Sequence, residues 1–337
     1  MNHIEILRRA FEITRRYRAL WVFGFLLALT TGGGGGNSGS SVNNGGGGGG
    51  NGSFTPPDWA TPEVVGQIVA AAFTIGLALL CLFLIVGIVF TIVRYVAETA
   101  AIRMVNRREE TGEEVGVRAG FRLGWSQGAL RIFLIDLLFG VAGFIVFGAL
   151  FLLAALPLFA WVFDNEPIGV LGTIVAVGLL LMVILLAIVV SLGWSLVVQF
   201  VRRASILEDL GVFDSIRRGF DLVRRRLGDI ILMGVIVVAI GLAIFLLMIP
   251  LAILLLVISV LVGGLPAVLA GSLVSLFAEG AAPYIIGFIV GFPIFLLVMI
   301  VPLTFITGLL RAFQSSVWTL TYREIVALEA LEPEVES

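Results

Sequence analysis

Few side chains in this chain could do chemistry in an apolar environment, and Asp136 is the clearest of them. It stands inside a long apolar run, five positions after Arg131. An acid within a membrane span is by default a candidate proton or cation site. The alternative is that Asp136 lies about 7 Å in, near the interface, bonded to an arginine of a preceding helix or reached by water. This alternative is favoured, because a pathway would normally show more polar residues at depth.

A second polar set follows in the next apolar run. Ser191, Ser195 and Gln199 are spaced four apart and share one helix face. Together with Asp136 they could line a path, which would make the protein a transporter or channel. More commonly, such hydroxyls bond to their own backbone or bridge helices, at a gain of ~0.6 kcal/mol each. Both interpretations stay open.

The residues needed for catalysis and metal binding are scarce. The chain has one histidine, His3, and one cysteine, Cys81. Cys/His catalysis and histidine-rich metal sites therefore lack components. There is no Gly-x-Ser-x-Gly elbow, and no span carries a pair of carboxylates. We predict a non-catalytic protein without a metal or cofactor.

Arginine gives the strongest signal. All 21 basic residues are arginine, and they cluster at residues 8–18, 94–131 and 202–226, with the last two at 311 and 323. Positive charge on cytoplasmic loops orients membrane proteins and needs only a few such residues. The excess predicts binding of anionic inner-leaflet lipid, at ~1 kcal/mol per arginine, or of a partner subunit. We expect Arg15, Arg16, Arg18, Arg217, Arg218, Arg224, Arg225 and Arg226 to carry this binding. Nucleic acid is not an expected partner, because lipid already occupies the positive electrostatic field of these arginines.

A short motif places these arginines on recurring elements. It reads RAFEI at residues 9–13, AGFRL at 119–123 and RGFDL at 218–222. Each copy leads directly into a long apolar run. An apolar stripe on an otherwise arginine-rich helix is typical of a helix lying in the membrane interface.

The third copy shows the stripe most clearly. Ile216, Phe220, Val223 and Leu227 fall at spacings of four, three and four, which defines one face of a helix. We therefore expect this helix to lie in the membrane interface, with the stripe as its apolar side and its guanidinium groups among headgroup phosphates.

Composition sets the fold class. The chain is 59% hydrophobic and 13% charged, and apolar runs beyond eighteen residues indicate a polytopic helical membrane protein. We predict an all-α bundle of about six spans, each outgoing span preceded by an amphipathic interfacial helix. The spans are expected near residues 19–29, 64–93, 129–159, 168–198, from 230 onward, and 283–310. In the uncharged stretch 230–278 we expect a kink at Pro250, a turn at residues 263–266 and a short outer helix over 267–277.

The same unit recurs three times: amphipathic helix, span out, outer loop, span back. The repeats cover residues 3–105, 116–209 and 214–324 and are parallel, so their pseudo-symmetry axis runs along the membrane normal. The alternative is that any three membrane hairpins with basic inner loops look alike. The arginine clusters share one side, which predicts a multi-pass protein of the cell membrane with both termini in the cytoplasm. Oligomeric state is not readable.

The repeats form a single transmembrane domain, residues 1–324, with two low-order segments expected. Residues 32–53 are almost entirely Gly, Asn and Ser, which predicts a flexible outer loop. Residues 325–337 are expected to be an acidic, disordered tail. At the N-terminus a signal peptide is the rival interpretation, although recurrence of the motif downstream argues against it.

Two stretches resemble a known group. Residues 202–211 (RRASILEDLG) with 215–220 (SIRRGF), and residues 7–11 (LRRAF) with 20–24 (LWVFG), are similar to a theme in uncharacterised bacterial six-span membrane proteins of unknown function. That group looks related to the membrane domain attached to some glycerophosphodiester phosphodiesterases. The resemblance implies fold and location. The catalytic domain of that family is absent here, so phosphodiesterase activity is not implied.

Overall fold

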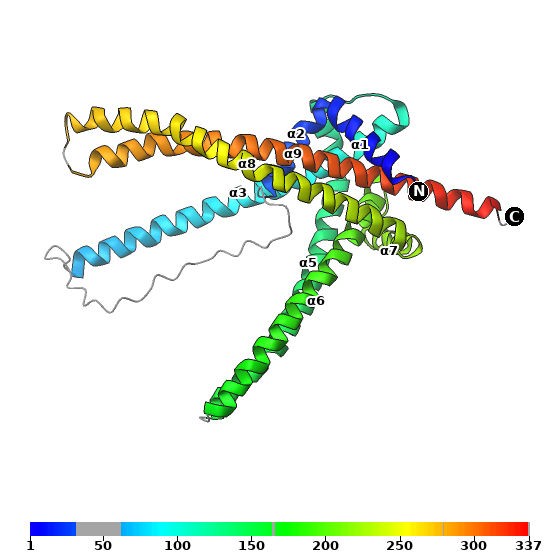
Figure 1. The fold of residues 1–337 in the computed structure, drawn as a ribbon, viewed down its shortest axis with the longest axis horizontal. Helices are drawn as coiled ribbons and strands as arrows, with labels where there is room; N and C mark the ends of the chain where they lie inside the picture. The colour runs from blue at the N-terminus through cyan, green and yellow to red at the C-terminus, as the bar shows by residue number, and fades with distance from the viewer. Residues whose placement is uncertain (32–61, 164–165, 279, 336–337) are drawn as a thin grey trace.

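The computed structural model describes residues 1–31, 62–163, 166–278 and 280–335. Within these ranges every regular element is helical (Figure 1). The elements are α1 (His3–Arg16), α2 (Arg18–Thr30), α3 (Pro62–Thr111), α4 (Val117–Gly124), α5 (Gln127–Ala155), the 3₁₀ helix η1 (Leu156–Phe163), α6 (Glu166–Leu207), α7 (Val212–Arg225), α8 (Leu227–Ser275) and α9 (Ala282–Val335).

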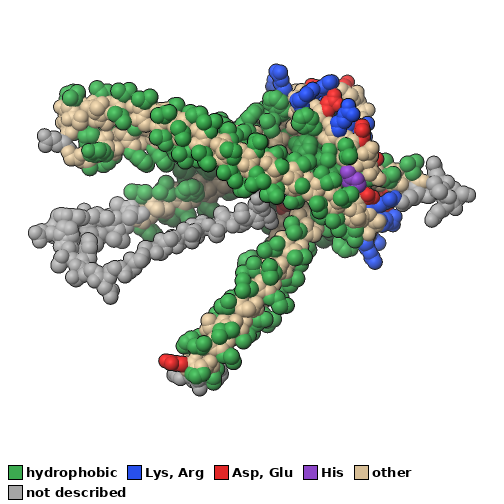
Figure 2. Space-filling model, viewed as in Figure 1, with side chains coloured by type: hydrophobic (Ala, Val, Ile, Leu, Met, Phe, Trp, Pro, Cys, Tyr) green, Lys and Arg blue, Asp and Glu red, His purple; other side chains and the backbone are tan. Residues whose placement is uncertain are grey.

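Five of these helices are long and apolar enough to cross a membrane, which makes the chain a multi-pass membrane protein. They extend as three arms from a common packed region, which we call the hub (Figure 1). One arm is the α5–α6 hairpin, one is the α8–α9 hairpin, and the third is α3. In the view of Figure 2 the described charged side chains gather at the hub, with one acid at the tip of the α5–α6 arm.

The hub contains the buried core. Its centre is the stretch of α9 from Ala312 to Tyr322, against which α1, α2 and the inner ends of α3, α6 and α8 pack. The largest fully buried side chains include Tyr17, Phe23, Phe200 and Met233. The arms contribute little: side chains 73–92 of α3 are exposed throughout. The hub is therefore the part of the molecule whose geometry is fixed by packing.

Small residues allow the amphipathic helices to pack closely against the backbones of neighbouring helices. A Cβ added at Gly219 of α7 would meet the Cγ2 of Val201 at 2.6 Å and its backbone nitrogen at 2.8 Å. A Cβ added at Gly124 of α4 would come still closer to the Val96 carbonyl of α3. Ala10 of α1 is fully buried. Thus α1 packs on α9, α4 on α3 and α7 on α6, with glycine or alanine at the closest approaches.

Tyr17 fixes the corner between α1 and α2. Its hydroxyl donates to the Val115 carbonyl at 2.8 Å and accepts from the Val115 N–H at 2.7 Å. The guanidinium of Arg108 lies 5.5 Å from its ring centroid. Burial raises the pKa of the Tyr17 phenol, because the phenolate would lose its hydration. One side chain thus ties the α1–α2 corner to the α3–α4 connection.

Several predictions about the elements are wrong in detail. The arms diverge and do not form a closed bundle (Figure 1). No turn breaks α8 at residues 263–266, because Gly263 instead packs against Gly291 and Phe295 of α9. The helix also continues through Pro250 and Pro266. Residues 325–335, expected to be a disordered tail, are the end of α9, where Ile325 is buried.

The glycine-rich stretch 32–53 lies outside the described residues. The first predicted span, residues 19–29, corresponds to α2, which has only 13 residues. At 1.5 Å per residue it is about 20 Å long, shorter than the ~30 Å hydrocarbon core. It packs against α3 and α9, with Gly24 against Gly308.

Candidate functional site

The inner parts of α3, α5 and α6 are joined by an ionic cluster built on Arg202 of α6. Its Nη2 donates to both carboxylate oxygens of Asp136 at 2.6 Å, and its Nε donates to Oδ1 at 2.9 Å. Its Nη1 donates to Glu98 of α3 at 2.6 Å. The three side chains are only 12–14% exposed. One guanidinium thus joins α3, α5 and α6.

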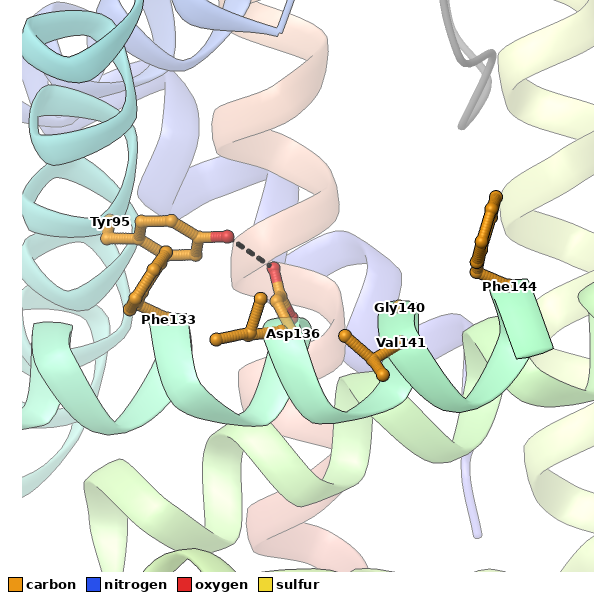
Figure 3. A pocket seen from close by; sticks show the side chains of 7 residues that line it. Tyr95, Phe133, Asp136, Gly140, Val141 and Phe144 are labelled. Carbon is orange, nitrogen blue, oxygen red and sulfur yellow. Dashed lines mark hydrogen bonds between the residues drawn. The ribbon is translucent and has the colours of Figure 1, made fainter.

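Asp136 has a further partner. The hydroxyl of Tyr95 on α3 donates to its Oδ2 at 3.1 Å (Figure 3). The two side chains lie in a pocket of about 310 Å³ lined by Phe133, Gly140 and Val141, among others. A buried carboxylate is tolerated when its charge is paired and its oxygens are hydrogen-bonded. Asp136 therefore lies near the inner end of its span and is held by an arginine, although that arginine is on α6 and not on an amphipathic helix.

Beside this pocket runs a larger apolar groove of about 1100 Å³ between α3 and α5. The two cavities share Tyr95 and Phe133. The groove is lined along α3 from Phe83 to Val96 and is bounded at its inner end by Trp125 and Ser126. Its lining suits hydrocarbon and not a hydrated ion.

The predicted polar face of α6 does not form a path. Ser191 and Ser195 are exposed, and each donates to the carbonyl three residues before it, at 2.8 and 2.7 Å. Gln199 accepts a 2.6 Å hydrogen bond from Arg203 in the next turn. The structure brings Gln199 toward the ionic cluster and leaves the two serines on the outer part of the arm.

Arg203 is 2% exposed and bonds to no carboxylate among the described residues. It donates to the carbonyl and side chain of Gln199 and, at 3.3 Å, to the Ser315 carbonyl of α9. Its Nε and the Ser315 hydroxyl have no hydrogen-bond partner in the described part of the chain. The hub thus buries more cationic than anionic groups.

The outer surface of the hub carries a second candidate site, on α7. Phe213, Arg217, Phe220 and Arg224 follow at spacings of four, three and four, and all four are exposed. The buried residues of α7 are Ser215, Gly219, Leu222 and Val223, so Val223 is the member of the predicted apolar stripe that packs against the protein.

The same face recurs on the other two amphipathic helices. On α1 it consists of Ile4, Arg8, Phe11 and Arg15, and on α4 of Arg118 and Phe121 with Trp125 just beyond the helix end; all are exposed. Phe11, Phe121 and Phe220 are 60%, 38% and 55% exposed, although the preceding Ala10, Gly120 and Gly219 are buried.

We call Arg8/Phe11, Arg118/Phe121 and Arg217/Phe220 the Arg–Phe pairs. Within the described ranges none of their arginines forms an ion pair or a hydrogen bond. The sequence prediction missed Arg8 and Arg118. Their signal was present in the spacing, since each arginine stands three residues before the phenylalanine of the motif.

The arginines that the sequence did single out fall into two groups. Arg15, Arg18, Arg217 and Arg224 are exposed and bond to no described residue. Others are held by carboxylates: Arg16 by Glu12 at 3.2 Å, Arg225 by Glu329 at 3.1 Å, and Arg218 by Glu329 at 2.7 Å and Glu208 at 3.4 Å. Arg226 is half-buried.

The contact with Glu329 has a measurable consequence. Its hydrogen bond raises the pKa of the Arg218 guanidinium above its ordinary value. Arg218 and Arg225 thereby tie α7 to α9 at Glu329. These two arginines hold protein to protein and are not available to lipid in the way that Arg217 is.

The other side chains that could take part in catalysis or metal binding do not cluster in the described structure. His3 lies 3.3 Å from the Asp229 carbonyl, Cys81 is exposed on α3, and no group of three potential metal ligands occurs among the described residues. Two sites therefore stand out, the buried ionic cluster and the exposed Arg–Phe pairs.

Comparison with known proteins identifies a family for this chain and gives no information on activity. Neither the curated proteins nor the solved structures give a match. The matching family description carries no link to glycerophosphodiester phosphodiesterases. A family of unknown function, DUF7544, matches residues 1–325, and the chain belongs to that family.

Proposed function

We propose that this protein is a non-catalytic integral membrane protein that gathers anionic lipid around its hub through the three Arg–Phe pairs. The observation that carries the proposal is their recurrence: on α1, α4 and α7 an exposed arginine that pairs with no described residue stands one helix turn before an exposed phenylalanine. In the membrane interface, phenylalanine enters the acyl boundary and arginine contacts headgroup phosphates.

Burial argues that this face meets lipid and not the protein's own core. Each helix buries its small residues and leaves its phenylalanine outside, the reverse of what water as surrounding solvent would select. The alternative is that a partner subunit covers this face. Three such faces on three separate helices suit a continuous surrounding phase better than a single partner.

The proposal includes a topology of six crossings in three parallel repeats, with both termini in the cytoplasm of a cell-membrane protein. Packing supports it: each amphipathic helix lies on the returning helix of the preceding unit, α4 on α3, α7 on α6 and, closing the ring, α1 on α9. We count α2, an apolar helix of 13 residues, as the sixth crossing.

A transporter or channel is the second candidate, favoured by the presence of Asp136 in a pocket. It is weaker, because both oxygens of Asp136 are bonded to Arg202 and one also to Tyr95. A flux abolished by Asp136→Asn would favour it. The absence of a catalytic activity remains a prediction, as does the likeness to the phosphodiesterase membrane domain.

The test measures anionic lipid around the purified full-length protein reconstituted in mixed phosphatidylcholine and phosphatidylglycerol. The triple variant Arg8→Gln, Arg118→Gln, Arg217→Gln should lose enrichment of phosphatidylglycerol in the lipid shell counted by mass spectrometry. At roughly 1 kcal/mol per arginine, each site should lose about fivefold in local preference.

The matched control removes the same charge from arginines that already have carboxylate partners: Arg16→Gln, Arg107→Gln, Arg225→Gln. These are exposed and paired with Glu12, Glu113 and Glu329. Enrichment should change little in this variant. An equal loss in both triples would reduce the effect to net charge, and no loss in either would refute the proposal.

A further inference from the structure

The groove between α3 and α5 is a second, larger cavity beside the Asp136 pocket. Its volume of about 1100 Å³ exceeds the ~300–1,000 Å³ of ordinary small-molecule sites. Its sides are apolar and include Phe83, Leu84, Ile88 and Ile92 of α3 with Leu130 and Phe133 of α5. The four α3 side chains are between 44% and 73% exposed, so the described part of the chain leaves the groove open along its length.

The length of the groove matches one leaflet of a bilayer. Its lining runs along α3 from Phe83 to Val96, which at 1.5 Å per residue is about 20 Å. Half of the ~30 Å hydrocarbon core is about 15 Å. The rings of Tyr95 and Phe133, 5.5 Å apart between centroids, form a wall that the groove shares with the Asp136 pocket (Figure 3). An extended acyl chain therefore fits the groove in both length and polarity.

The inner end of the groove carries hydrogen-bond donors. It is lined by Trp125, Ser126 and Gln127. The Trp125 indole and the Gln127 amide bond to no described residue. The Ser126 hydroxyl accepts a 3.1 Å hydrogen bond from Nη1 of Arg103 and makes no capping bond to α5. Its own proton is thus available to an acceptor in the groove.

The charge beside this end is positive. Arg103 of α3 and Arg131 of α5 both contact Oδ1 of Asp209, at 3.6 and 3.4 Å, so two guanidinium groups share one carboxylate. A Cβ added at Gly128 would lie 3.4 Å from Nη2 of Arg103 and 3.4 Å from the Ser126 hydroxyl, which places the Arg103 guanidinium beside the first turn of α5. A group that accepts hydrogen bonds and carries negative charge fits this end, as a phosphate does.

We propose that the groove binds one phospholipid of the leaflet nearer to the hub. Its acyl chain lies along α3, and its phosphate accepts hydrogen bonds at Ser126, Gln127 and Arg103. Apolar sides, donors and positive charge follow one another along the groove in the order of chain and headgroup. A second copy of this chain, covering the groove with an apolar helix face, would leave the donors without acceptors, which is costly away from water.

This lipid differs from the surrounding lipid that the Arg–Phe pairs gather, because it occupies a cavity with a stoichiometry of one. The groove meets the exposed face of α4 at Trp125, and Arg8, Arg118 and Arg217 do not line it. The inference therefore does not rest on the proposed function.

The experiment is native mass spectrometry of the delipidated full-length protein in a maltoside detergent, titrated with one probe at a time. The probes are phosphatidylglycerol, diacylglycerol as the phosphate-free lipid with the same chains, and glycerol 3-phosphate as the headgroup without chains. Wild-type protein should bind one phosphatidylglycerol more tightly than every further copy and retain it on collisional activation. Neither control should bind at the same concentration, because each lacks one half of the ligand.

A bulky side chain in the groove tests the acyl part of the site. Gly87 lines the groove, and a Cβ added there meets nothing within 4 Å. Gly87→Phe should therefore fold, and by filling the groove it should weaken the tight site at least about tenfold. The matched control is Gly76→Phe, which adds the same ring to the same helix at a position that is equally open and does not line the groove. It should keep the wild-type affinity.

Arg103→Gln tests the phosphate part. It should weaken the tight site about tenfold, as expected for one lost charged hydrogen bond, and Arg103→Lys should recover part of the loss. Because Arg103 also donates to the Leu123 carbonyl, Gly87→Phe decides the question if Arg103→Gln does not fold. The triple variant Arg8→Gln, Arg118→Gln, Arg217→Gln should keep the tight site.

Three outcomes would overturn the proposal: no tightly held phosphatidylglycerol, equally tight binding of diacylglycerol, or tight binding unchanged in Gly87→Phe. A dimer that only Gly87→Phe disrupts would assign the groove to a second copy and would overturn it as well. Loss of the tight lipid only in the Arg–Phe triple variant would sink the groove site and leave the proposed function standing. The converse result, loss in Gly87→Phe with unchanged lipid enrichment in the triple variant, would keep the groove site and refute the proposed function.

Discussion

At the scale of single residues, this molecule uses the guanidinium group in two opposite ways. Arg202 is 12% exposed and bonded to two carboxylates, whereas Arg217 is exposed and bonds to no described residue. The first holds helices together, and the second remains free for headgroups. Sequence position does not distinguish them, since both belong to the same arginine cluster of residues 202–226. What separates them is the partner across the fold, 66 positions away for Asp136.

Removing Arg202 tests its structural role. Arg202→Gln leaves Glu98 and Asp136 buried without their counter-charge, which should destabilise the fold by roughly 3 to 5 kcal/mol. Unfolding in detergent, followed by circular dichroism or Tm, measures the loss. The control Arg107→Gln breaks an exposed pair with Glu113 and should cost less than about 1 kcal/mol.

A compensated variant sharpens this prediction. Glu98→Gln, Asp136→Asn and Arg202→Gln together remove all three charges, and this triple should recover most of the stability lost in Arg202→Gln. A mild effect of Arg202→Gln alone would mean that water or another cation already reaches the carboxylates, and the cluster would then be a candidate ion site after all.

At the scale of elements, the sequence predicted the amphipathic helices and an apolar stripe suited to the membrane interface, and the structure divides that stripe. Of its residues on α7, Val223 is buried against the protein, while Phe220 and Leu227 are exposed. Spacing identifies the apolar positions but not which of them pack on the neighbouring helix. In a lipid surrounding, large apolar residues face outward and small ones pack inward, so Gly219 marks the inner face better than the stripe does.

Gly219 tests the inward contact. Gly219→Ala places a Cβ 2.6 Å from Val201 Cγ2 and 2.8 Å from the Val201 nitrogen, so α7 must shift off α6, at a cost of about 1 to 3 kcal/mol. Gly228→Ala, where the Cβ meets nothing within 4 Å, should be neutral or slightly stabilising. The Tm values of the two variants, measured in the same detergent, test this difference in stability. Equal values would show that the α6–α7 contact is looser than the structure has it.

At the scale of the whole molecule, hydropathy predicted an all-helical, multi-pass chain, and the five long apolar helices agree. Hydropathy did not predict three diverging arms, because an apolar run does not specify whether lipid or another helix contacts it. Lipid competes with protein on nearly equal terms for leucine and isoleucine. The continuation of α8 through Pro266 was missed, since a proline inside a membrane helix is tolerated when neighbours satisfy the freed carbonyl.

The central claim is that α1, α4 and α7 lie in the membrane interface with their phenylalanines toward lipid. Nitroxide labels on Phe11→Cys, Phe121→Cys and Phe220→Cys, each in a Cys81→Ala background, test it by power-saturation electron paramagnetic resonance in liposomes. All three labels should report one common depth, about 5 to 10 Å into the headgroup and acyl boundary. They should be accessible to oxygen and shielded from a water-soluble nickel chelate, while a label at the exposed Glu113 is open to the chelate. Chelate accessibility at any of the three positions equal to that at position 113 would contradict the account.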